Sequence, residues 1–382
     1  MNIRKLSSFA PLIITLLGAM ILLCGCGRDL AGDSRQVAET WRFAIEESEG
    51  SVQHEYALRF KRLIEERTNG EVEVVVYPYG TLGTSTHITE QLNMGVVEFA
   101  MASPGSLGKF IPEMQVFLLH FVLSQDDRTN QRILSDPRLI EDLDQLYAPK
   151  GLKLLSIYSE GEMVWTMKQR VRSPDDFGNV KMRVMTSPIL LAAYDAYGAS
   201  PTPMPYSEVY SALQLNMIDG QVNPIFAIER QKFHEVTSWM IFPGHTSFIT
   251  TCAANRPFVE TLPANHQAIL KRTITELDEY IFGVQTQFQT ERLKDILRDK
   301  KRKQSPLKVI GKMDRFVNSL SAEEQKELID ENPYLEFRPP LSEQEIAAFR
   351  QASRDVRDVY LEIGGRDAPE VLARLLEATK AK

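Results

Sequence analysis

Residues 181–224 read KMRVMTSPILLAAYDAYGASPTPMPYSEVYSALQLNMIDGQVNP, and this stretch predicts the fold class. It begins with an apolar run that alternates with Lys181 and Arg183, which is the period of a β-strand. Helical spacing follows, then Pro205 interrupts the chain and Ser207 is placed to cap a further helix. Strands that alternate with helices are typical of an α/β protein with a largely parallel sheet. The expected elements are strands at 180–185 and 218–222 and helices at 188–196 and 207–214.

The same alternation runs through the chain on the amino-terminal side of this stretch. Two successive α/β units joined by more than one crossing strand indicate two lobes with a cleft between them. Ligands of such sheets bind outside the carboxyl ends of the strands. The expected strands cover 41–46, 71–77, 96–101, 152–158 and 163–167, with helices at 52–64 and 86–94.

A long helix is predicted on the carboxyl-terminal side. An apolar stripe from Leu270 to Phe288 alternates spacings of four and three, which places it on one helical face. Pro263 suits the first turn of this helix. We expect the helix to span 263–300 and to brace both lobes. Further on, Ser321 and Ser342 each begin a capping box, so helices are expected there as well.

The N-terminus resembles the signal of a secreted lipoprotein. Arg4 and Lys5 precede an apolar run from Phe9 to Leu23 that is too short for a dependable membrane span. The ending Leu-Cys-Gly-Cys resembles a bacterial lipobox, in which Cys26 receives the acyl chains, such as palmitate. An ordinary cleaved signal and a transmembrane anchor are the alternatives.

These patterns divide the chain into several parts. We expect a lipoprotein signal peptide at 1–25, a tether at 26–39, lobe 1 at 40–158 with part of 247–283, lobe 2 at 159–246 with part of 284–382, the long helix at 263–300 and a C-terminal helical extension at 305–382.

The overall composition narrows the function. Of the 382 residues 43% are hydrophobic and 25% charged, as in an ordinary globular protein. A formal net charge of -7 argues against a protein that coats nucleic acid. The six scattered histidines and the one free cysteine of the mature chain, Cys252, show no zinc-ligand spacing, so we expect no metal and no cofactor.

Two residues of the opening stretch are candidates for binding a solute. Arg183, near the carboxyl end of a strand, can offer its planar guanidinium to a carboxylate. Asn223 has both a donor and an acceptor for a ligand. Taken singly, a surface arginine and a turn asparagine are the competing interpretations.

An ordered set of motifs resembles one family. The set is Pro-x-Asp at 174–176, Lys-Met-Arg-Val at 181–184, Pro-Tyr-Ser-Glu-Val-Tyr-Ser-Ala-Leu at 205–213 and Asp-Gly-Gln-Val-Asn-Pro at 219–224. It is similar to the solute-binding proteins of tripartite ATP-independent periplasmic (TRAP) transporters, of the dicarboxylate-binding-protein type. The resemblance implies an α/β, two-lobed periplasmic-binding-protein fold with the ligand cleft between the lobes.

The resemblance also implies roles for individual residues. The arginine of the Lys-x-Arg-Val strand, here Arg183, grips the ligand's carboxylate, and Asn223 approaches the same group. An aromatic residue at Tyr206 packs on the ligand. Loops near Glu47, Ser48 and Ser103 face it.

This sequence departs from the family at one point. Many members carry a second arginine about twenty residues before the strand arginine, where this chain has Glu162 and Met163, followed by Trp165. A glutamate beside Arg183 would partly neutralise it. We therefore expect a monocarboxylate or a largely apolar carboxylate, with these three residues near the ligand.

The predicted function is that of a periplasmic, membrane-anchored lipoprotein that delivers a small organic acid to a membrane permease. The resemblance implies the small and large TRAP permease subunits as partners, and some relatives also work beside a helical-repeat lipoprotein. The alternatives are a binding protein of an ABC transporter, a sensor, or an enzyme on the same scaffold. For the enzyme, His245 is the best lone candidate, but no nucleophile-elbow motif is present.

Overall fold

The computed structural model describes residues 39–380. The predicted signal peptide, Cys26 and all but the last residue of the tether therefore lie outside the described residues. Within the described part, no helix is both long enough and apolar enough to cross a membrane.

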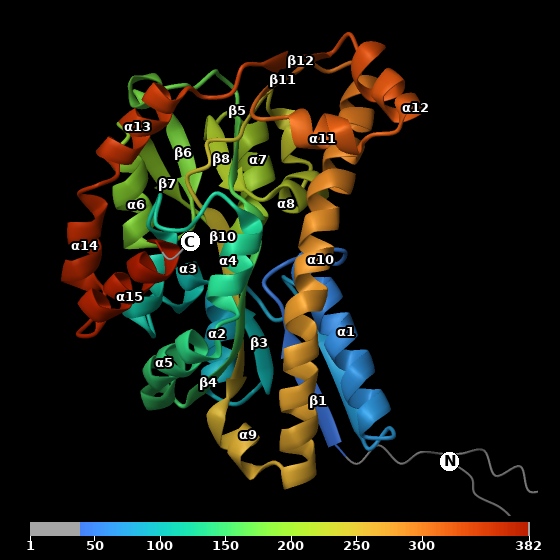
Figure 1. The fold of residues 1–382 in the computed structure, drawn as a ribbon, viewed down its shortest axis with the longest axis vertical. Coiled ribbons are helices and arrows are strands. Elements are labelled where there is room, and N and C mark those ends of the chain that lie inside the picture. Colours follow the sequence, from blue (N-terminus) through green and yellow to red (C-terminus); the bar gives the residue numbers. More distant parts are fainter. Residues whose placement is uncertain (1–38, 381–382) are drawn as a thin grey trace, which may run out of the picture. The chain divides into compact units, whose positions relative to one another are not determined.

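A five-stranded sheet forms the lower half of the described chain in Figure 1, with the order β2-β1-β3-β10-β4. The first three strands are parallel, and β10 runs antiparallel between β3 and β4. The strands are β1 (Glu39–Ala44), β2 (Val72–Tyr77), β3 (Phe99–Ala102), β4 (Leu152–Glu162) and β10 (Ser247–Asn255). The helices that follow them are α1 (Val52–Arg67), α2 (Ser85–Asn93), α3 (Pro104–Leu107), α4 (Asp127–Leu134), α5 (Pro137–Tyr147) and α9 (Arg256–Thr261).

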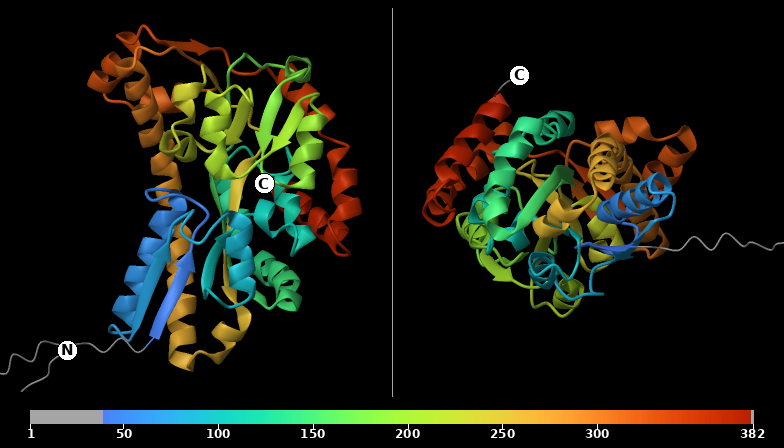
Figure 2. Two further views of the ribbon diagram at one scale, coloured as in Figure 1. Left: turned by 180° about the vertical axis from the view of Figure 1, so that it is seen from behind. Right: turned by 90° about the horizontal axis from the view of Figure 1, so that it is seen from below.

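A second, seven-stranded sheet has the order β12-β11-β9-β5-β8-β6-β7. Its strands are β5 (Val164–Met167), β6 (Lys181–Val184), β7 (Ser200–Pro203), β8 (Gly220–Asn223), β9 (Trp239–Ile241), β11 (Leu307–Ile310) and β12 (Leu335–Arg338). Its helices include α6 (Pro188–Asp195), α7 (Val209–Gln214) and α8 (Ile225–Arg230). Seen from behind, strands β1 and β2 and strands β6 and β7 all point toward the region between the two sheets (Figure 2, left). The two-lobed α/β prediction is therefore confirmed.

The chain crosses between the sheets at three places. Strand β4 continues through Met163 into β5, and residues 242–246 return the chain from β9 to β10. The third connection is α10 (Ala264–Arg302), whose 39 residues extend over about 58 Å at 1.5 Å per residue. This predicted long helix packs on α1 and β4 of the first sheet and on α8 of the second (Figure 1).

The C-terminal extension contains strands as well as helices, which corrects the expectation that it is helical. Strands β11 and β12 add two parallel strands to one edge of the second sheet. Their short alternating runs, LKVI and LEFR, suit a half-covered strand. Strand β9 offers an edge to β11, and β11 in turn offers one to β12. The predicted capping boxes at Ser321 and Ser342 are both present. The helices are α11 (Asp314–Ser319), α12 (Ala322–Gln325), α13 (Glu343–Ala352), α14 (Val356–Ile363) and α15 (Ala368–Lys380).

The tail is anchored by an aromatic cluster, and we expect its loss to destabilise the protein. Phe349 of α13 is 1% exposed, and its ring centroid lies 5.3 Å from that of Trp165 and 5.1 Å from that of Tyr197. Phe349→Ala should lower the free energy of unfolding by about 3–5 kcal/mol, as for other buried phenylalanines. Urea denaturation followed by tryptophan fluorescence measures this change, with Phe349→Leu as the milder control. A loss below about 1 kcal/mol would mean that the tail is not part of the cooperative core.

Candidate functional site

Several polar groups, most of them predicted to meet the solute, lie where strands of the two sheets end. Glu46 and Glu47 follow β1, and Ser103 follows β3, on the side of the first sheet. Arg183 is the last residue but one of β6, and Asn223 ends β8, on the side of the second sheet. The cleft therefore has the position expected for ligands of α/β sheets.

Arg183 is a buried cation. It is 3% exposed, and its Nε and Nη2 donate hydrogen bonds of 3.2 and 2.9 Å to the Met204 carbonyl. Burial lowers its pKa to about 10, while Tyr206, Tyr79 and Glu47 counteract this shift. The guanidinium thus keeps its charge at neutral pH, and no described residue accepts a hydrogen bond from its Nη1. Such a group has donors left for a ligand anion.

Three buried carboxyl groups lie near this cation. Glu46 Oε2 accepts a hydrogen bond from the Ser103 backbone N–H, and Glu160 Oε1 accepts one from Gln53. One oxygen of each carboxyl group, including Glu47, has no hydrogen-bond partner in the described chain. Desolvation raises the pKa of all three groups, that of Glu47 to about 8.

Tyr206 connects the two halves of the cleft. Its ring meets that of Tyr79 edge to face at 5.6 Å, and the Tyr79 backbone N–H donates to the Glu47 carbonyl at 3.0 Å. The buried Tyr206 hydroxyl and the Glu47 carboxylate influence each other's pKa, yet no hydrogen bond of ordinary geometry joins them. Both groups are therefore available to a ligand.

Asn223 is held by neighbours on the same face of the second sheet. Its Nδ2 donates to Gln221 Oε1, and Gln221 Nε2 donates to Thr166 Oγ1 at 2.7 Å. Gln221 is also the register partner of Arg183 across the β6–β8 ladder. This chain of hydrogen bonds fixes the asparagine amide beside the arginine.

The remaining predicted residues have different surroundings. Ser48 is half-buried, and its Oγ lies 3.5 Å from Gln231 Nε2. Glu162 accepts a hydrogen bond from the Gly244 backbone N–H, so the carboxylate that acts on Arg183 is that of Glu47. Trp165 is fully buried, and its Nε1 donates to Tyr194 in the aromatic core. Met163 is buried at the crossing between the sheets. The structure does not bring these last three residues together with Arg183.

Three residues of the cleft are not among those predicted from the sequence. Glu46 has the sequence character of the polar end of a strand, although its position directly before Glu47 is a signal. Glu160 was missed because β4 was predicted to end at residue 158, whereas it continues to Glu162. Tyr79, in the loop after β2, gave no sequence signal.

Two features outside the cleft are occupied by their own neighbours. His245 is buried with its Nε2 3.4 Å from the Tyr194 hydroxyl, and burial and His120 lower its pKa. His234, Glu235 and Asp299 are grouped closely enough to hold a metal ion. However, the ammonium of Lys303 lies 2.6 Å from Glu235 and 3.1 Å from Asp299, so a cation is already bound there.

The fold and the cleft define a solute-binding protein of the TRAP-transporter type, not an enzyme. A family model described as bacterial extracellular solute-binding protein, family 7, matches residues 43–308, and the chain belongs to this family.

Relatives of known name support this assignment. The ectoine/5-hydroxyectoine-binding periplasmic protein UehA of Ruegeria pomeroyi is 41% identical over 65% of this chain and 73% of its own. The ectoine-binding periplasmic protein TeaA of Halomonas elongata is 41% identical over 61% of this chain and 68% of its own.

Solved structures of TRAP solute-binding proteins also resemble this chain. The Halomonas elongata ectoine-binding protein superposes with a TM-score of 0.77, at 33% identity over 90% of this chain and 100% of that one. An apo, open TRAP solute-binding protein from Marinobacter aquaeolei gives 0.74, at 36% identity over 88% and 99%.

Proposed function

We propose that this protein binds ectoine or a closely related compact zwitterion and delivers it to a TRAP permease. The observation that carries the proposal is the pairing of one buried guanidinium, Arg183, with the buried carboxyl group of Glu47 in the same cleft. Ectoine is a cyclic amidinium that bears one carboxylate. Its carboxylate would bind Arg183 and Asn223, and its ring N–H groups would donate to Glu47.

The charges of the cleft disfavour the other solute classes. A dicarboxylate would bring its second anionic group against Glu46, Glu47 and Glu160, and Arg183 is the one cation that residues 39–380 place beside them. An apolar tail would leave the free carboxyl oxygens desolvated without partners, which costs several kcal/mol in total, at about 1–3 kcal/mol per group. The apolar carboxylate expected from the sequence is therefore replaced by a zwitterion in this proposal. The two ectoine-binding relatives at 41% identity support the same choice.

Isothermal titration with ectoine, succinate and octanoate tests the proposal. We expect saturable binding of ectoine and no measurable heat from the other two at equal concentration. Tighter binding of succinate or octanoate than of ectoine would overturn it.

We further propose that acylated Cys26 holds the protein on a membrane face, beside the small and large permease subunits. The lipobox-like ending supports this. Mass spectrometry of the mature N-terminus tests it: Cys26→Ser should remove the acyl mass and release the protein into the periplasmic fraction. An additional helical-repeat lipoprotein partner has no support from the relatives.

A further inference from the structure

A second pocket, with a volume of about 540 Å³, lies on the α10 side of the strands that cross between the sheets. Glu47, Arg183, Tyr206 and Asn223 of the solute cleft do not line it, whereas Glu160, which lies between the two sites, does. Successive residues of β4 separate the two sites. Glu160 reaches Gln53 on the cleft side, whereas a side chain at Gly161 would meet Gln285 and Gln289 of α10. The volume is typical of small-molecule sites.

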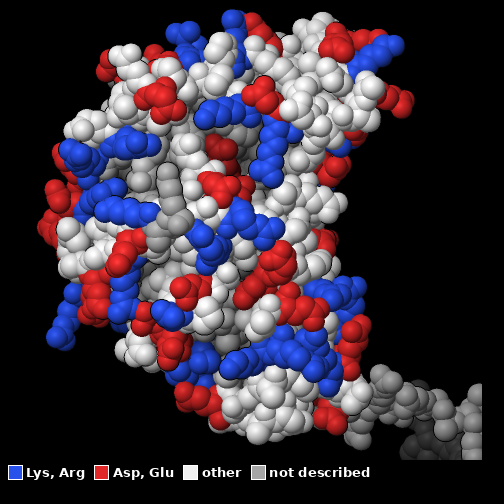
Figure 3. Space-filling model, viewed as in Figure 1, with Lys and Arg blue, Asp and Glu red and all other residues white. Residues whose placement is uncertain are grey.

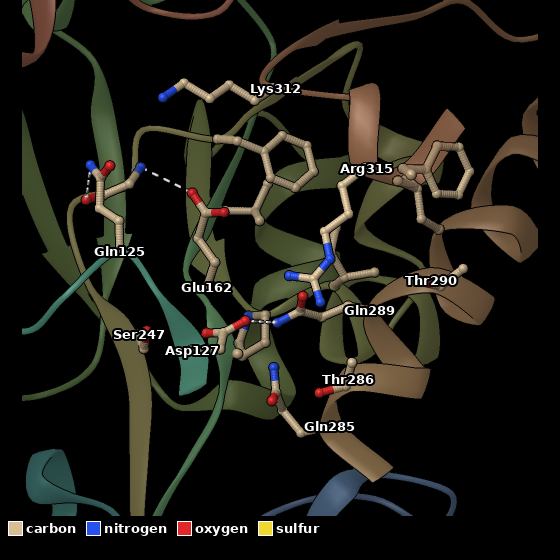
Figure 4. A pocket seen from close by; sticks show the side chains of 18 of the residues that line it. Gln125, Asp127, Glu162, Ser247, Gln285, Thr286, Gln289, Thr290, Lys312 and Arg315 are labelled. Carbon is tan, nitrogen blue, oxygen red and sulfur yellow. Dashed lines mark hydrogen bonds between the residues drawn. The ribbon is translucent and has the colours of Figure 1, made fainter. Parts of the chain in front are cut away.

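The floor of the pocket carries an unsatisfied amide. Gln285 is 1% exposed, yet neither its Oε1 nor its Nε2 has a hydrogen-bond partner in the described chain. Figure 4 shows this amide pointing into the pocket, beside Gln289, whose Nε2 donates to Asp127 at 3.1 Å. A buried amide without partners is costly, so a ligand with both a donor and an acceptor would be stabilised there.

The C-terminal extension supplies two cations to the same pocket. Lys312 lines it from the segment between β11 and α11, and Arg315 lines it from the first turn of α11. The Arg315 guanidinium is directed toward its centre (Figure 4). Neither forms an ion pair with another described residue. Elsewhere on the face shown in Figure 3, basic and acidic side chains are intermixed. The lining also contains the carboxyl groups of Asp127, Glu160 and Glu162. Burial raises the pKa of Glu160, and that of Glu162 to about 7, which favours their neutral forms. The unpaired Arg315 guanidinium, with Lys312 nearby, then favours an anion.

Part of the wall is aromatic. Four phenylalanines from four different segments line the pocket: Phe226, Phe242, Phe288 and Phe316. Such walls favour a flat, apolar ligand body, since aromatic pairs are stabilised beyond their buried area.

We propose that this pocket is a second ligand site, which takes a small aromatic carboxylate with a polar ring substituent. Lys312 and Arg315 would hold the carboxylate, the phenylalanines would enclose the ring, and the Gln285 amide would bind the substituent. The site is independent of the proposed solute.

A fluorescence titration with 6-hydroxy-2-naphthoate tests the proposal. It is done on the wild-type protein and on Arg183→Ala, in which the solute cleft has lost its anion-binding group. We expect 6-hydroxy-2-naphthoate to bind saturably to both proteins. Binding of 2-naphthol, which lacks the carboxylate, should be at least tenfold weaker. Absence of saturable binding to Arg183→Ala would overturn the proposal.

Variants locate the binding. Lys312→Ala/Arg315→Ala should weaken it at least tenfold, and Thr286→Trp, which fills the pocket from α10, should abolish it. Lys271→Ala/Arg272→Ala removes two exposed cations elsewhere on α10 and should leave it unchanged. Equal loss in this control would refute the site. Failure of ectoine to bind, with the naphthoate pattern intact, would count against the proposed solute alone.

Discussion

Arg183→Ala is expected to raise the Kd for ectoine by a factor of between about 30 and several thousand. The guanidinium is 3% exposed, so the solute carboxylate would lose its one buried cation and be desolvated without compensation. Truncation of one member of a buried charge pair costs about 2–5 kcal/mol, which is the range given. Isothermal titration of both proteins at pH 9, where Glu47 is ionised, measures the change.

Arg183→Lys is the matched control, because it keeps the charge but loses the planar fork. It should bind more weakly than the wild type and more tightly than the alanine variant. Lys181→Ala, on the same strand but exposed, should bind normally. If Arg183→Ala retained wild-type affinity, the solute carboxylate would have to bind elsewhere, and the proposed orientation would be wrong.

Ectoine affinity should rise with pH up to about pH 8 and then level off. Burial raises the pKa of Glu47 from 4.5 to about 8, so at pH 6 the empty cleft holds a proton on this group. An amidinium favours the ionised carboxylate, so binding releases the proton, and the association constant should increase up to tenfold per pH unit below the pKa. Titrations at pH 6, 7, 8 and 9 measure the slope.

Glu47→Gln should abolish this slope and lower the affinity at pH 9 by at least tenfold, because the amide cannot pair with the cation. Glu46 and Glu160 face the same space and also have raised pKa values. If the affinity of Glu47→Gln for ectoine still rose with pH, the proton released on binding would therefore come from Glu46 or Glu160.

The same shift affects the empty protein in the opposite direction. Because the folded chain holds the Glu47 proton and the unfolded chain loses it above pH 4.5, the free energy of unfolding falls as pH rises from about 4.5 to about 8. Ectoine should restore stability most strongly near the upper end of this range.

The sequence alone predicts the strands in which polar and apolar residues alternate clearly. The run around Arg183 and the motif ending at Asn223 predicted β6, β8 and the cleft, because period and turn chemistry are local properties. The resemblance placed Glu47, Ser103 and Tyr206 at the same cleft.

What the sequence did not predict depends on contacts between distant segments. Tryptophan is a residue type that often stacks on ligands, but aromatic rings of α6, α13 and the segment before β6 enclose Trp165. Glu162 was placed beside Arg183 by its spacing along the chain, yet it turns toward Gly244. Strands β11 and β12 are not predicted, because β11 pairs with β9, which lies more than sixty residues earlier, and within residues 39–380 β12 pairs only with β11.

The edges of the seven-stranded sheet bear on how the protein behaves in a crowded compartment. Edge strand β7 contains Pro201 and Pro203, which cannot donate to a neighbouring strand. The opposite edge, β12, carries the paired charges of Glu336 and Arg338 and runs into Pro339 and Pro340. Neither edge is therefore a suitable template for a strand from another chain. The extension that widens the sheet thus ends it in an edge that resists pairing with another chain.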